Sequence, residues 1–149
     1  QVAILRDRLA RWRHPSMVKL MMGGFSEIPG LVVELEELVH MPHLDAPKDR
    51  PFPFVYFISI INNSAEKVTI FGRKWILKEE GGETLVFEGE GVVGEVPVLN
   101  SGERFSYNSY HVIKTRTVVT GSFFGKDSEG GRVVVHIPAF DLEPPGDQA

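Results

Sequence analysis

The chain has 149 residues, with 16 basic against 20 acidic side chains, a formal net charge of −4, 42% hydrophobic residues and no cysteine. These values describe one globular domain with a core of its own, and the missing cysteines exclude disulfides, thiolate zinc sites and cysteine nucleophiles. No apolar stretch reaches the roughly 20 residues that a bilayer span needs, and no secretory leader is recognisable, so we expect a cytoplasmic protein.

The first 24 residues differ from the rest in charge. They hold five basic residues and one acidic residue, a charge of +4, whereas the remainder holds eleven basic and nineteen acidic residues, a charge of −8. Leu5, Leu9 and Trp12 follow the spacing of one helical face. We therefore predict a basic amphipathic helical extension over residues 1–24 and a domain over residues 25–149. The helix is expected to pack on the domain or to join two copies as a homo-oligomer, and contact with a membrane surface or RNA is the alternative. The acidic domain of residues 25–149 is not expected to bind nucleic acid specifically.

After this extension the hydrophobic period changes from helical to two. Residues 31–36 alternate between apolar and polar side chains, which predicts a strand with one face buried and the other exposed to solvent. Residues 40–53 hold four prolines and are expected to form an extended connection. Residues 54–61 are apolar on both faces, as in a central strand, and residues 67–79 form another strand whose inward pattern shifts by one position at Gly72, which indicates a bulge.

The second half of the chain continues the β pattern. Strands are predicted at residues 83–88, 104–110, 114–124 and 132–137, with an ordered loop over residues 89–100. Turn signals at roughly 8–12-residue spacing and no helical pattern in this half are typical of sandwich domains. The predicted fold is therefore an all-β, immunoglobulin/fibronectin III-like antiparallel β-sandwich of about seven strands, with the short N-terminal helical extension.

The glycine loop is the first candidate site. Gly89, Gly91 and Gly94 form a Gly-x-Gly-x-x-Gly pattern, but no helical pattern follows it, so the helix N-terminus that binds a dinucleotide is missing. A nest of backbone N–H groups toward an anion is the alternative to a structural turn. Three glutamates flank the loop, and their carboxylates would repel an anion. Arg73 and Lys74 are the nearest positive charges that could compensate.

Metal and catalytic sites are not predicted. His40, His43 and Asp45 supply nitrogen and oxygen ligands, but the proline between the two histidines keeps this segment extended, so their convergence is not expected. The hydroxyl-bearing residues near His111 are expected to be hydrogen-bonded turn residues, because nothing predicts an oxyanion hole; they are Ser106, Ser109 and Tyr110. We therefore expect a non-enzyme with no metal site and no cofactor.

Several ordered motifs resemble the ApaG family. They are Ile60-Ile61-Asn62-Asn63, Arg73-Lys74-Trp75-Ile76, the stretch from Gly89 to Leu99, Gly102-Glu103 with Phe105-Ser106-Tyr107, and Ile137-Pro138-Ala139-Phe140. The chain departs from the family pattern at residues 108–111, where a Thr-Ser-Gly-type turn is usual, and at Val118. The resemblance implies a fibronectin type III-like fold. It also implies a link to divalent cation balance, including cobalt resistance and magnesium efflux in bacteria, and a binding role in eukaryotic relatives, which include F-box proteins and a partner of a replicative DNA polymerase.

Two functional hypotheses follow. The first is a non-catalytic ApaG-like interaction domain that presents the glycine loop and adjoining turns to a protein partner. The alternative is binding of a nucleotide or pyrophosphate, an anionic small molecule, by that loop. The candidate ligand- or partner-binding residues are Gly89, Gly91, Gly94, Arg73, Lys74, Tyr110 and Phe140.

Overall fold

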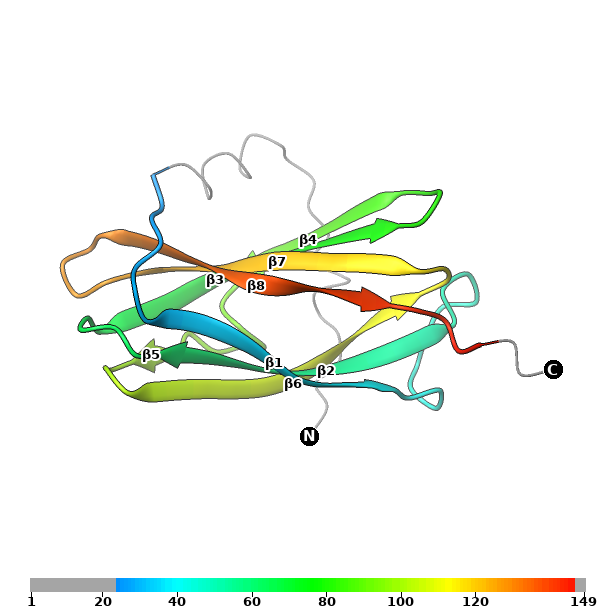
Figure 1. The fold of residues 1–149 in the computed structure, drawn as a ribbon, viewed down its shortest axis with the longest axis horizontal. Helices are drawn as coiled ribbons and strands as arrows, with labels where there is room; N and C mark the ends of the chain where they lie inside the picture. Colours follow the sequence, from blue (N-terminus) through cyan, green and yellow to red (C-terminus); the bar gives the residue numbers. More distant parts are fainter. Residues whose placement is uncertain (1–23, 147–149) are drawn as a thin grey trace.

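The structure, a computed structural model, describes residues 24–146, and every regular element within them is a β-strand (Figure 1). The predicted helical extension lies outside the described residues. The strands are β1 (Leu31–His40), β2 (Phe52–Asn62), β3 (Val68–Glu79), β4 (Thr84–Glu90), β5 (Val98–Leu99), β6 (Glu103–Ile113), β7 (Thr117–Lys126) and β8 (Arg132–Leu142). The all-β prediction is confirmed, and the two-residue β5 lies within the predicted loop. No helix among the described residues is long and apolar enough to cross a membrane.

The strands form two antiparallel sheets. One has the order β1-β2-β6 and the other the order β4-β3-β7-β8, with β5 paired to the start of β3. The central position predicted for the strand at residues 54–61 is confirmed, because β2 pairs with β1 and with β6 along its length. The bulge predicted at Gly72 is confirmed by a register shift between Ile70 and Gly72 in the β3–β7 ladder.

The core lies between the two sheets and draws on both. Tyr56, Trp75 and Phe123 are among its fully buried side chains, and the rings of Tyr56 and Trp75 lie 4.9 Å apart across the two layers. These residues follow the alternation that directs every second side chain of a strand inward. Phe71, which lies within the register shift, contacts Phe25 with ring centroids 6.2 Å apart and is not part of this core.

The two long flanks of the layered structure differ. On one flank β1 lies against β8, and Ser26 bridges Val133 just before β1 begins (Figure 1). On the other flank the edge strands are β4 and β6, which belong to different sheets. This second flank holds a cavity described below.

Candidate functional site

The glycine loop follows β4 as a tight turn. The N–H of Gly91 donates to the carbonyl of Phe71 at 2.6 Å, and Val92 and Glu95 exchange two backbone hydrogen bonds of 2.7 and 3.0 Å. Val93 and Gly94, the central residues of that turn, have φ values of 44° and 84°. Positive φ at both central positions is the signature of a type I′ turn, so the loop is a defined structural element.

Arg73 braces this turn from inside. Its side chain is buried, and Nη1 donates to the carbonyls of Glu90 at 2.7 Å and Gly91 at 3.1 Å. The guanidinium lies over Gly89, where a Cβ would come within 2.6 Å of Nη2, so a side chain at this position would displace the guanidinium. The structure thus brings Arg73 together with the loop, but the contacts are to carbonyl oxygens, as in a structural brace.

Lys74 faces the opposite side of the sheet. Successive strand residues point to opposite faces, and Lys74 pairs directly with Glu88 across β3 and β4. The N–H groups of Gly91, Val92 and Glu95 are bonded within the chain. Anion binding by the loop stays a prediction. An anion would need hydrogen-bond donors other than these three N–H groups, because they already bond to carbonyls of the chain.

Tyr110 and Phe140 lie far from the glycine loop. Tyr110 is buried in a second, smaller core on the outer face of β2 and β6, where its hydroxyl donates to the carbonyl of Asp45 at 3.0 Å. The expectation that a partner could reach Tyr110 is therefore wrong, because residues 41–46 cover it. Phe140 on β8 is half-buried, with its ring centroid 6.3 Å from that of Trp75.

The histidines near the start of the β1–β2 connection do not gather as metal ligands. The ring of His40 lies against Phe54, with centroids 5.0 Å apart, whereas His43 is exposed. Among residues 24–146 no group of three or more histidine, aspartate or glutamate side chains is arranged to hold a metal ion.

A polar row that was not predicted crosses the outer face of the larger sheet. Ser122 Oγ and His136 Nδ1 are 2.8 Å apart, and His136 Nε2 lies 3.7 Å from a carboxylate oxygen of Glu27. Lys74 and Glu88 continue the row, and burial raises the pKa of Glu88 while Lys74 opposes this shift. The predicted turn between the last two strands implies that residues 122 and 136 face each other, which is the signal that could have found this pair.

This serine–histidine pair does not form a hydrolytic centre. Ser122 lies in the middle of β7, paired with β3 on one side and β8 on the other, so the nearby backbone N–H groups belong to the ladders of the sheet. An oxyanion hole needs free donors directed at one point. The 3.7 Å separation from Glu27 also exceeds hydrogen-bond distance.

Exposed apolar side chains gather where the glycine loop leads into β5. Among residues 24–146 the large hydrophobic side chains that are exposed are Val32, Val96 and Val98, at 42%, 55% and 47%. Val96 and Val98 flank Pro97, whose carbonyl accepts a hydrogen bond from the N–H of Ile70 at 2.9 Å. They line a shallow groove of about 500 Å³, whose other lining residues are Glu95, Pro97, Leu99, Glu103, Arg104 and Phe105.

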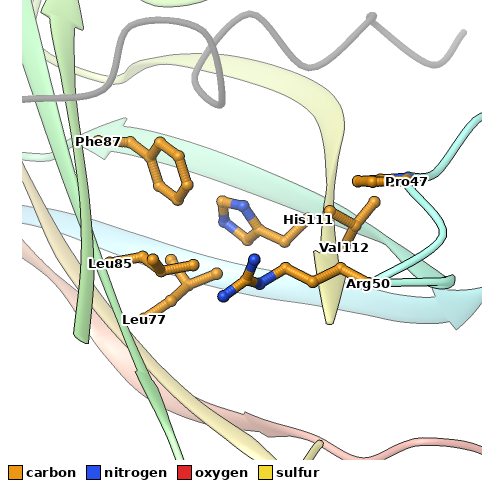
Figure 2. A pocket seen from close by; sticks show the side chains of 7 residues that line it. All are labelled: Pro47, Arg50, Leu77, Leu85, Phe87, His111 and Val112. Atoms are coloured by element: carbon orange, nitrogen blue, oxygen red, sulfur yellow. The ribbon is translucent and has the colours of Figure 1, made fainter. Parts of the chain in front are cut away.

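His111 lines a cavity of about 160 Å³ on the β4–β6 flank (Figure 2). Its ring is fully buried, stacks on Tyr56 with centroids 4.9 Å apart and meets Trp75 edge-on at 4.8 Å. Neither ring nitrogen has a hydrogen-bond partner, and burial lowers its pKa to about 3. The expectation that Ser106, Ser109 and Tyr110 are turn residues is wrong, because they lie on β6 together with His111, and alternation directs the His111 side chain inward.

Two packed antiparallel sheets, a braced glycine turn and a cavity between edge strands define a small all-β domain. A family model described as ApaG domain matches residues 42–126, more than half of the chain. Protein ApaG of Vibrio vulnificus is 33% identical over 100 residues, which are 66% of this chain and 79% of the relative. Protein ApaG of Acidithiobacillus ferrooxidans is 36% identical over 107 residues, which are 71% and 84% of the two chains.

Two solved structures are similar to this chain in fold. An X-ray structure of a Northeast Structural Genomics Consortium target is 28% identical with a TM-score of 0.70, covering 79% of this chain and 89% of its own. A Bordetella pertussis protein described as ApaA has a TM-score of 0.68 over 81% and 98% of the two chains; at 24% identity this is a likeness of fold alone. The chain belongs to the ApaG domain family, which confirms the resemblance found in its motifs.

Proposed function

We propose that this chain is a non-catalytic interaction domain that binds a protein partner through the loop of residues 91–99. Two exposed valines, Val96 and Val98, carry this proposal, since they stand on a loop whose backbone is held in place. Divalent cation balance in the cytoplasm, which the family resemblance implied, is the physiological setting that we propose for the complex.

The loop has the character of an interaction surface. Its backbone is tied to β3 through the N–H groups of Gly91 and Ile70, and Arg73 holds it from inside. A loop that is already ordered loses little conformational entropy on binding, so a modest apolar contact contributes more to affinity. An apolar patch rimmed by polar side chains is also typical of protein–protein contacts, and here the rim consists of Glu95, Glu103 and Arg104.

The proposal is tested with a Val96→Asp/Val98→Asp double variant. The full chain is used to capture a partner from cells, the partner is then purified, and its Kd is measured by calorimetry. We expect the double variant to weaken binding by at least about tenfold, because it places two charges in the apolar contact. The matched control is Val32→Asp on β1, which changes the third exposed valine and should leave the Kd unchanged.

Equal binding by the double variant and the unmodified chain would refute the use of this loop. Equal weakening by Val32→Asp would also contradict the proposal, because it would indicate a general effect of added charge. Thermal unfolding of the variants distinguishes loss of contact from loss of folding. All three sites are surface positions, where substitutions are usually within about 0.5 kcal/mol of neutral.

A further inference from the structure

The cavity on the β4–β6 flank is separate from the loop of residues 91–99. Figure 1 shows β5 at one end of the two sheets and the β1–β2 connection at the other, and this connection supplies Arg50 to the cavity. The cavity is lined by Pro47, Arg50, Leu77, Leu85, Phe87, His111 and Val112 (Figure 2). It therefore draws on β3, β4 and β6 and on a connection distant from them in the sequence.

Two polar residues, Arg50 and His111, line this cavity, and His111 is the one whose polar atoms have no partner. Both ring nitrogens are buried without a hydrogen-bond partner, although a buried polar group without a partner is destabilising. The ring is held between Tyr56 and Trp75, so its orientation is set by packing. Because the imidazole is neutral at pH 7, one ring nitrogen is able to donate a hydrogen bond and the other to accept one.

Charges at the edge of the cavity do not favour an anion. Arg50 donates from Nε to Glu79 at 2.7 Å and from Nη2 to Glu83 at 3.0 Å, so its guanidinium is already engaged by carboxylates. Asp49 lies 3.5 Å from Arg50, and Lys114 lies 3.9 Å from Glu79. The edge of the cavity thus has two cationic side chains, Arg50 and Lys114, and three carboxylates, so its net charge is negative.

Size and lining favour a single aromatic ring. The cavity volume of about 160 Å³ is close to that of the cavity of about 150 Å³ which binds benzene in an engineered core. Leu77, Leu85 and Phe87 present apolar surface to the space. A ligand here needs an uncharged ring and one polar group that reaches His111.

We propose that this cavity binds an uncharged phenolic ring, whose hydroxyl group pairs with the unpartnered imidazole of His111 while the ring packs on Leu77, Leu85 and Phe87. A hydroxyl both donates and accepts, so it complements either nitrogen of a neutral imidazole. The phenol belongs to a free small molecule or to a tyrosine side chain of a protein. This site is independent of the loop proposed above for a partner.

Phenol and toluene form a matched pair of probes, because they differ in one hydroxyl group. Binding to the full chain is followed by NMR through the ¹⁵N signals of His111, identified by their absence in His111→Phe. We expect saturable binding of phenol that shifts these signals, with a Kd about tenfold lower than that of toluene. In His111→Phe the two probes should bind equally, and His43→Gln, an exposed loop change, should match the unmodified chain.

A second variant keeps the test decisive if His111→Phe does not fold. Leu85→Phe fills the cavity while leaving His111 in place, and it should abolish binding of both probes. Equal Kd values of phenol and toluene for the unmodified chain, or no saturable shift of His111, would overturn the proposal. N-acetyl-tyrosinamide distinguishes the sources: a Kd equal to that of phenol assigns the site to a tyrosine side chain, and much weaker binding assigns it to a free phenol.

Discussion

Gly91 and Gly94 both lie in the glycine loop with positive φ, yet their surroundings differ. A Cβ on Gly91 would collide with the carbonyl oxygen of Glu95, whereas a Cβ on Gly94 would meet open space. The first glycine is therefore required by backbone conformation and by close approach, and the second by conformation alone.

This difference predicts unequal costs of substitution. Gly94→Ala should lower the free energy of unfolding by about 1–2 kcal/mol, the cost of a left-handed conformation in a residue with a Cβ. Gly91→Ala should cost more, because the turn must also shift away from the added methyl group. Urea denaturation measures both values. Equal values for the two variants would contradict the close approach of Glu95 to Gly91.

At the scale of elements, the larger sheet keeps charged side chains on its outer face. Glu88 on β4 and Lys74 on β3 are direct cross-strand neighbours, and both are buried. Burial penalises the ionised carboxylate, so the pKa of Glu88 is raised above its ordinary value of 4.5 even though Lys74 opposes this. The folded state therefore holds a proton on Glu88 more tightly than the unfolded chain does.

The stability of the sheet should then depend on pH through Glu88. As the pH rises above about 4.5 and through the raised pKa, the folded state loses stability, because only the unfolded chain ionises this carboxyl freely. Glu88→Gln removes the titration, so its gain in unfolding free energy over the unmodified chain should grow with pH across that window. Glu90→Gln, at the exposed end of β4, is the control. A gap that is constant with pH would contradict the raised pKa.

For the whole molecule, His111 links acid stability to the central packing. Its pKa of about 3 in the folded state compares with an ordinary value of 6.5, so between these limits the unfolded chain binds a proton that the folded chain does not. Stability should fall as the pH is lowered from about 6.5 toward 3, by at most about 1.4 kcal/mol per pH unit. In His111→Phe this contribution should vanish, whereas His43→Gln should keep it. Chemical denaturation at a series of pH values measures it.

Ligand-dependent unfolding tests the alternative role of the glycine loop. Because three N–H groups of the turn are bonded within the chain, we expect no saturable rise in Tm with ATP or pyrophosphate, alone or with Mg²⁺ or Co²⁺. A ligand at about 100 times its Kd would add about 2.7 kcal/mol, a shift of several degrees in a domain of this size. Such a shift, lost in Gly94→Ala, would favour nucleotide or pyrophosphate binding instead.

Much of the element structure could be predicted from local patterns. The strand of residues 54–61 was recognisable as central because it is apolar on both faces, and the bulge at Gly72 because the inward pattern slips by one position. The immunoglobulin or fibronectin III-like subclass stays a prediction. The environment of Tyr110 was not predictable, since it depends on which segment covers the outer face of β6.

The sequence by itself determined the all-β fold and the order of most strands along the chain, because alternation and turn chemistry are properties of neighbouring residues. The family followed from the ordered motifs that resemble ApaG proteins, and the family model confirms it. Only the tertiary structure decided what the candidate residues do. It directed Arg73 to carbonyls of the loop rather than outward, and it enclosed His111 with Arg50 and Leu85, which lie far from it along the chain. Such contacts arise when two sheets pack, and this packing brings together residues that no local spacing relates.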